Sequence, residues 1–169
     1  HDKVAVLDGG FTKWQAEGRA VEDTVATPKA ASFCADYRED MVRSVEQMLA
    51  MIDQGGDRQI IDARGAGRFD GTAAEPRAGL RSGHMPGACN LPYDKLLNED
   101  GTLRSTEQLR ALFTDAGVDL ERPVVTSCGS GVSAAVLLLG LRTLGHEDNT
   151  LYDGSWSEWG SRKDTPVVT

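Results

Sequence analysis

The sequence lacks an excess of positive charge, with 18 Lys and Arg residues against 26 Asp and Glu residues and a formal net charge of −8. It also lacks a long apolar run, because the longest, residues 134–141, is far shorter than the roughly 20 residues of a membrane-spanning helix. We therefore expect a soluble chain whose main partner is neither nucleic acid nor an anionic membrane surface.

Cysteines are also few, and they are far apart in the sequence. Cys34, Cys89 and Cys128 form neither the close pairs typical of a metal site nor the even-numbered set of a disulfide framework. We therefore predict no metal site, and we expect no cofactor and a reducing compartment such as the cytoplasm. Cys34 and Cys89 are expected to be small, buried or half-buried side chains. Any cysteine chemistry then falls to Cys128.

Cys128 lies in the stretch of the sequence that carries the most information. Residues 124–127 are mostly β-branched and follow Pro123, which predicts a short buried strand. Residues 132–144 are rich in Ala and Leu and end at Gly145, which predicts a helix. Cys128 is therefore expected at a turn between a strand and the N-terminus of a helix.

This predicted position favours an ionised sulfur at Cys128, because the free N–H groups and the dipole of a helix N-terminus stabilise an anion. Gly129 and Gly131 can adopt positive φ angles. Together with Ser130 and Ser133 they would turn N–H and O–H donors toward the sulfur, which lowers the pKa of its thiol. The alternative, a cysteine packed inertly under a glycine-rich turn, fits this loop composition less well.

The remaining sequence predicts strands that alternate with helices. Strands are expected at residues 4–7, 59–63, 88–91, 124–127 and 150–152, and helices at residues 11–16, 41–52, 105–116, 132–144 and 155–159. Such alternation indicates an α/β domain with a mainly parallel sheet and helices on both faces. Ligands of these sheets bind beyond the carboxyl ends of the strands, where Asp62, the long loop 64–87 and Cys128 are expected to meet.

Three ordered motifs resemble those of a known family. They are CGSGVS at residues 128–133, GHMPGA at residues 83–88 and YDGSWSEW at residues 152–159. The first is similar to the active-site loop of the mercaptopyruvate sulfurtransferase branch of the rhodanese superfamily, and the other two are similar to signatures of that superfamily. The resemblance implies a rhodanese-like fold.

The same resemblance implies a reaction and its residues. Cys128 would take sulfur from 3-mercaptopyruvate as a persulfide, release pyruvate and pass the sulfur to cyanide or to a thiol acceptor such as thioredoxin. Ser130 would act as a catalytic helper with a His and an Asp from a preceding domain. Arg68, in Gly-Arg-Phe, and Arg77, in Glu-Pro-Arg, match the residues that bind the carboxylate, for which a planar guanidinium is suited. The loop holding the persulfide would consist of Gly129, Ser130, Gly131, Val132 and Ser133.

Other polar residues near this site are given structural roles. Asp62 is expected to brace the turn after its strand, and Arg64 to pair with a neighbouring acid. Arg81 is interpreted as structural or solvated. His84 lies in a Pro-Gly turn, where a histidine usually supports the backbone rather than acting as a catalytic base.

The chain contains one visible internal repeat. LDGGFTKW at residues 7–14 matches YDGSWSEW at residues 152–159 at a constant, domain-sized offset. We interpret residues 1–22 as the tail of a preceding rhodanese-like domain, residues 23–32 as a linker and residues 33–169 as the catalytic rhodanese-like domain. The sequence is then predicted to be a fragment, and the rest of the preceding domain is its expected partner.

Three rival functions remain at this point. A cysteine-dependent phosphatase needs an arginine at the sixth position after the nucleophile to hold phosphate, and Ala134 stands there. A non-catalytic rhodanese-like module usually lacks the cysteine that this sequence keeps. A thiosulfate sulfurtransferase usually has basic residues directly after the cysteine, whereas residues 129–131 are uncharged.

Overall fold

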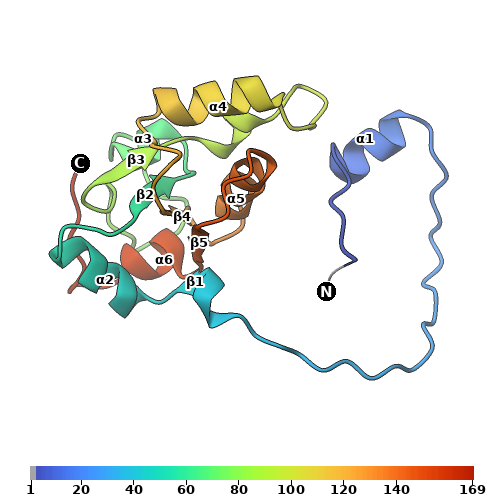
Figure 1. The fold of residues 1–169 in the computed structure, drawn as a ribbon, viewed down its shortest axis with the longest axis horizontal. Coiled ribbons are helices and arrows are strands. Elements are labelled where there is room, and N and C mark those ends of the chain that lie inside the picture. Colours follow the sequence, from blue (N-terminus) through green and yellow to red (C-terminus); the bar gives the residue numbers. More distant parts are fainter. Residues whose placement is uncertain (1–2) are drawn as a thin grey trace.

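The computed structural model describes residues 3–169, and within them five strands form one sheet (Figure 1). The spatial order is β1-β5-β4-β2-β3, and every pair of neighbours is parallel. The strands are β1 (Val42–Arg43), β2 (Gln59–Asp62), β3 (Ala88–Asn90), β4 (Val124–Ser127) and β5 (Asn149–Tyr152). The predicted α/β class with a parallel sheet is confirmed.

Helices connect the strands, and two of them begin with a capping box. Ser44 caps α2 with Gln47, and Ser105 caps α4 with Gln108, which satisfies backbone N–H groups that have no partner inside the helix. No helix of the described chain is long and apolar enough to cross a membrane. The helices are α1 (Gly10–Ala16), α2 (Val45–Asp53), α3 (Ala66–Phe69), α4 (Thr106–Asp115), α5 (Ala134–Thr143) and α6 (Ser155–Trp159), with 3-10 turns at Glu39–Met41 and Tyr93–Leu96.

Both faces of the sheet are covered, as Figure 1 shows. Successive side chains of a strand point to opposite faces. Ile61 and Val124 therefore join the core beneath α4 and α5, while Ile60 and Val125 join the core beneath α2 and α6. Burial on both faces explains why the central strands are apolar without interruption.

Two predicted elements at the start of the chain differ from the structure. Residues 4–7 form no strand, and Val4 is 72% exposed, because no strand lies beside them in the described chain to complete a hydrogen-bonded ladder. The helix predicted from residue 41 begins only at Val45. Val42 and Arg43 instead pair with Leu151 and Tyr152 as the edge strand β1.

The other boundaries differ by smaller amounts. α5 begins at Ala134 rather than at residue 132, since residues 130–133 wrap around the cysteine and leave Val132 77% exposed. β5 begins at Asn149, one residue earlier than predicted, and β2 and β3 each end one residue earlier than predicted. The loop at residues 64–87 contains the short helix α3, which was not predicted because the segment is rich in glycine.

Residues 3–38 lie apart from the sheet (Figure 1). Residues 18–38 contain no helix or strand and join α1 to the rest of the molecule. The α1 segment contacts the loop before α4, where Asp8 Oδ1 accepts a hydrogen bond from the Leu103 N–H at 2.8 Å and Lys13 lies 3.5 Å from Asp100. The α1 helix itself buries no residue.

Candidate active site

Cys128 directly follows β4, at the carboxyl edge of the sheet and before α5. Its side chain belongs to the same buried core as Ala134 and Leu137 of α5, and only 1% of the residue is exposed. The carbonyl of Cys128 accepts the Trp156 N–H at 2.9 Å, so that the start of α6 anchors this turn. The cysteine is therefore fixed between two helices.

The donors around the Cys128 sulfur favour its thiolate. Burial raises the pKa of the thiol, but hydrogen bonds from the Ser133 hydroxyl, the Ser130 and Ala134 N–H groups and the Ser155 hydroxyl outweigh it. The net result is a pKa below the ordinary cysteine value. Such a thiol is more nucleophilic at neutral pH than an ordinary one.

The two glycines of the loop have different roles. Gly131 has φ 84°, and a Cβ there would lie 2.6 Å from Asp153 Oδ1. Gly129 does not use the positive φ that is open to a glycine. A Cβ at Gly129 would instead lie 2.9 Å from Arg68 Nη2, so this glycine allows the guanidinium to approach the loop backbone.

Ser155 is a site residue that sequence reasoning missed. Its Oγ accepts the Cys128 N–H at 3.1 Å and lies 2.9 Å from the Tyr152 carbonyl oxygen and 4.0 Å from the cysteine sulfur. Ser155 has φ 50°, which is unusual for a residue with a side chain. The internal repeat could have indicated this unusual φ, because the position equivalent to Ser155 in the first copy is a glycine, Gly10, with φ 60°.

Arg68 and Arg77 line one small pocket next to the cysteine loop, together with Gly129 and Ser130. Its volume of about 120 Å³ equals that of roughly four liquid water molecules, which suits a molecule of a few heavy atoms. Arg77 donates a hydrogen bond to the Ser157 hydroxyl. Ser130 is exposed, and its hydroxyl makes no hydrogen bond within residues 3–169. Val132 points away from the core.

A buried ion network supports Arg68 from behind, and its centre, Glu75, was also missed. Glu75 lies 2.8 Å from Arg64 and 2.6 Å from Arg68, and Arg64 lies 2.7 Å from Asp62. Asp62 Oδ1 also accepts the Arg64 N–H at 2.9 Å, as expected for a residue that braces its turn. The predicted pairing of Arg64 with a neighbouring acid is confirmed.

Arg81 and His84 have structural contacts, as predicted. Arg81 donates to the carbonyls of Trp159 and Thr165 at 2.9 and 2.8 Å. His84 Nδ1 lies 2.9 Å from the Phe69 carbonyl, and the two rings stack with centroids 3.7 Å apart. Arg81 therefore holds the 64–87 loop against the C-terminal segment, while His84 braces the loop internally against Phe69.

The other two cysteines lie away from this site. Cys89 is half-buried, as predicted, and burial raises the pKa of its thiol to about 11. The same prediction is wrong for Cys34, which is exposed because the extended segment around it packs on no core. The described chain contains no cluster of side chains suited to a metal ion.

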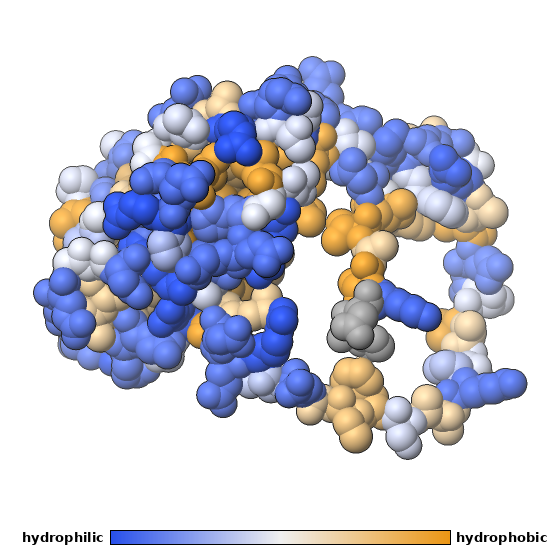
Figure 2. All heavy atoms as spheres, in the orientation of Figure 1, coloured by the Kyte–Doolittle hydropathy of each residue, from blue (hydrophilic) through white to orange (hydrophobic). Residues whose placement is uncertain are grey.

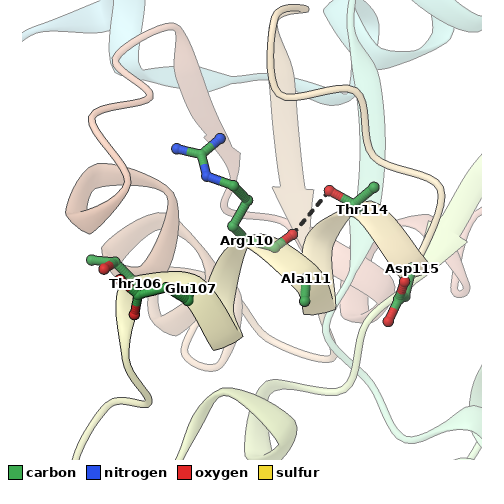
Figure 3. A pocket seen from close by; sticks show the side chains of 6 residues that line it. All are labelled: Thr106, Glu107, Arg110, Ala111, Thr114 and Asp115. Carbon is green, nitrogen blue, oxygen red and sulfur yellow. Dashed lines mark hydrogen bonds between the residues drawn. The ribbon is translucent and has the colours of Figure 1, made fainter.

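A larger hollow of about 570 Å³ lies on the outer face of α4 (Figure 3). Its six lining residues all come from that one helix, and Thr114 among them bonds back to the Arg110 carbonyl at 2.9 Å. The hollow contains no cysteine, histidine or lysine. It therefore offers no thiol nucleophile, and the smaller pocket beside Cys128 is the better candidate.

The sequence matches the family described as the rhodanese-like domain over residues 44–162. The match covers strands β2 to β5, the cysteine loop and the pocket. The chain belongs to the rhodanese-like domain family. Its parallel sheet with helices on both faces is the fold that this membership requires.

Individual relatives of this rhodanese-like chain are sulfurtransferases. The 3-mercaptopyruvate sulfurtransferase of Escherichia coli (strain K12) is 44% identical over 98% of this chain and 58% of its own length. A thiosulfate sulfurtransferase of Rattus norvegicus is 42% identical over 96% of this chain and 54% of its own length. The crystal structure of SseA from Escherichia coli, titled a 3-mercaptopyruvate sulfotransferase, superposes with a TM-score of 0.78 at 41% identity, over 92% of this chain and 57% of that one. The chain thus spans little more than half the length of these relatives.

Replacing Ser133 with alanine is expected to raise the pKa of Cys128 in the rhodanese-like domain, because the variant loses the strongest hydrogen bond that favours the thiolate. A raised pKa leaves less thiolate below neutral pH. The rate at which iodoacetamide alkylates Cys128 is measured from pH 5.5 to 9. The midpoint of the rise of this rate with pH should therefore move to a higher pH. Ser161→Ala, which removes an exposed hydroxyl bonded to the Glu158 carbonyl, is the control and should leave the midpoint unchanged. An unchanged midpoint in Ser133→Ala contradicts the account.

Proposed function

We propose that this domain transfers sulfur from 3-mercaptopyruvate to a thiol or cyanide through a persulfide on Cys128. The observation that carries the proposal is that two features lie at the same loop. One is a cysteine whose hydrogen-bond donors lower its pKa, and the other is a small pocket lined by two arginines. The first supplies a nucleophile, and the second supplies recognition of a small carboxylate. The relatives named as 3-mercaptopyruvate sulfurtransferases support the same reading.

In the proposed step, the Cys128 thiolate attacks the sulfur of the donor and forms an S–S bond. The donor's C–S bond breaks, and its electron pair remains on carbon as the enolate of pyruvate, which then takes a proton. The cysteine sulfur is oxidised to a persulfide as the carbon is reduced. The Ser130 and Ala134 N–H groups, which face the sulfur, stabilise negative charge before and after the step.

The pocket gives the remaining residues their proposed roles. Arg68 and Arg77 hold the carboxylate, and Ser130, with its free hydroxyl at the mouth of the loop, polarises the donor. Gly129, Gly131, Val132 and Ser133 complete the loop that encloses the persulfide. A thiol acceptor such as thioredoxin then attacks the outer sulfur and restores the Cys128 thiolate.

We also propose that residues 1–22, of which residues 3–22 are described, end a preceding rhodanese-like domain, that residues 23–32 are the linker, and that residues 33–169 form the catalytic domain. Val4, Val6, Leu7 and Phe11 are exposed, although side chains of this kind are usually buried. Figure 2 shows apolar atoms on these first residues and on the body of the molecule around α5. A rhodanese-like match in the sequence preceding residue 1 of the natural protein tests this organisation. The three unpaired cysteines support a reducing compartment, which we propose is the cytoplasm.

The proposed activity is tested by pyruvate release. The full-length protein, supplied with 3-mercaptopyruvate and reduced thioredoxin, should release one pyruvate for each sulfur transferred. Thiosulfate with cyanide should give a much lower kcat/KM. Equal turnover of the two donors would favour a thiosulfate sulfurtransferase, and no turnover of either would favour a binding module.

A further inference from the structure

We infer that Glu75 sets the net charge of the donor pocket and thereby selects monoanionic over dianionic sulfur donors. The inference rests on the proposed function and concerns a residue that lines the pocket beside the cysteine loop. It adds a determinant of specificity that lies outside that loop. Three observations lead to it: the contacts of Glu75, the rigidity of its support and the balance of charges.

The contacts of Glu75 occupy one edge of the Arg68 guanidinium. Its Oε2 accepts from Arg68 Nη2 at 2.6 Å, and its Oε1 accepts from Arg68 Nε at 3.2 Å. Arg68 Nη1 makes no hydrogen bond within the part of the chain that the structure describes, so the Nη1–Nη2 edge remains for a ligand. A Cβ built on Gly129 would lie 2.9 Å from Nη2 and 3.6 Å from Nη1, which places this guanidinium against the cysteine loop.

The support behind Glu75 is rigid. The Glu75 side chain is 2% exposed, and its Oε1 also accepts from Arg64 Nη1 at 2.8 Å. Arg64 is fully buried, lies 4.1 Å above the Trp156 ring, and donates to both carboxylate oxygens of Asp62. Rotation of Glu75 away from Arg68 would therefore also break its hydrogen bond to Arg64 and leave the buried Arg64 Nη1 donor without a partner.

The charges of this network cancel. Asp62 and Glu75 contribute two negative charges, while Arg64 and Arg68 contribute two positive ones. Arg77 is then the one uncompensated charge among the residues that line the pocket. A pocket with one net positive charge neutralises a bound monocarboxylate. A bound dianion would instead keep one negative charge that is neither neutralised by the pocket nor hydrated by water, which is unfavourable.

Two variants of Glu75 separate its charge from its geometry. Glu75→Gln keeps the shape and adds one positive charge to the pocket, so it should favour a dianion. Glu75→Asp keeps the charge and shortens the reach to Arg68, so it should weaken the binding of both donors to a similar extent without favouring a dianion. Glu147→Gln, an exposed acid just before β5 and at the opposite edge of the sheet from Cys128, makes the same charge change away from the pocket.

The experiment compares kcat/KM for 3-mercaptopyruvate and thiosulfate in the full-length protein and these three variants. We expect Glu75→Gln to move the ratio of the two values at least tenfold toward thiosulfate, and the other two variants to leave the ratio near that of the wild type. A shift of equal size in Glu75→Gln and Glu75→Asp, or no shift in Glu75→Gln, overturns the inference. If the wild type turns over neither donor, the proposed function fails instead.

A second measurement needs neither turnover nor a variant. Methanesulfonate and sulfate have similar tetrahedral heads but carry one and two negative charges. At constant ionic strength, methanesulfonate should slow the alkylation of wild-type Cys128 by iodoacetamide at a lower concentration than sulfate does. Equal or better protection by sulfate, or no protection by either anion, overturns the inference. The result also decides the matter if Glu75→Gln does not fold.

Discussion

Replacing Gly131 with alanine is expected to lower kcat/KM for 3-mercaptopyruvate by about 10- to 100-fold. The backbone φ of 84° strains a residue with a side chain by about 1–3 kcal/mol, which the loop relieves by shifting. Each 1.4 kcal/mol of transition-state stabilisation that the shifted donors lose is worth about tenfold in rate. The new Cβ would also lie 2.6 Å from Asp153 Oδ1 and 3.1 Å from the Asp153 carbonyl oxygen. The loop must therefore shift, and its donors move away from the Cys128 sulfur.

The matched control is Gly145→Ala, at the end of α5. Gly145 has φ 79°, but a Cβ there meets nothing within 4 Å. This variant should lose stability from backbone strain in the same way while keeping kcat/KM close to the wild-type value. Thermal unfolding and steady-state kinetics of both variants separate the two effects. Wild-type kinetics in Gly131→Ala would show that the loop geometry does not govern catalysis.

Replacing Arg77 or Arg68 with lysine is expected to lower kcat/KM for 3-mercaptopyruvate by about 5- to 150-fold, mainly through a higher KM. Lysine keeps the charge but loses the planar pair of donors that holds a carboxylate, at a cost of about 1–3 kcal/mol. Arg68→Lys also loses one of the two hydrogen bonds to Glu75, so its kcat/KM should fall further than that of Arg77→Lys. Thiosulfate, which depends on charge more than on a planar fork, should be affected less.

Arg122→Lys is the control for these two variants. Arg122 is exposed and precedes β4, so it lies at the opposite edge of the sheet from the cysteine loop. Its kinetics should equal those of the wild type for both donors. If Arg68→Lys and Arg77→Lys lose both activities alike, the pocket does not recognise the carboxylate.

The fold could be predicted where burial alone dictates the residues. The apolar pairs Ile60–Ile61 and Val124–Val125 lie in strands covered on both faces, and the capping box at Ser105 fixes the start of α4. The edge strand β1 was missed because Val42 and Arg43 are only partly buried and continue a helical pattern. Residues 4–7 were predicted as a strand because their apolar side chains match the pattern of a buried strand. A strand also needs a neighbouring strand to pair with, and the local sequence pattern does not show whether one is present.

The candidate site was predictable only in part. The position of Cys128 between β4 and α5 follows from local patterns, and so does the pairing of Arg64. Glu75 and Ser155 were missed because their importance depends on contacts that are distant in sequence, with Arg64 for Glu75 and with Cys128 for Ser155. Burial of an acid beside two arginines is a property of the folded chain, and composition alone gives no sign of it.

The central claim is that Cys128 carries the sulfur, and mapping the added sulfur tests it most directly. The protein is incubated with 3-mercaptopyruvate, freed of excess donor and digested without reductant, and its peptides are weighed by mass spectrometry. One additional sulfur should be found, on the peptide that contains Cys128. Cys128→Ser should show none, while Cys34→Ser and Cys89→Ser should match the wild type. Sulfur on the exposed Cys34, or sulfur that persists in Cys128→Ser, would contradict the account.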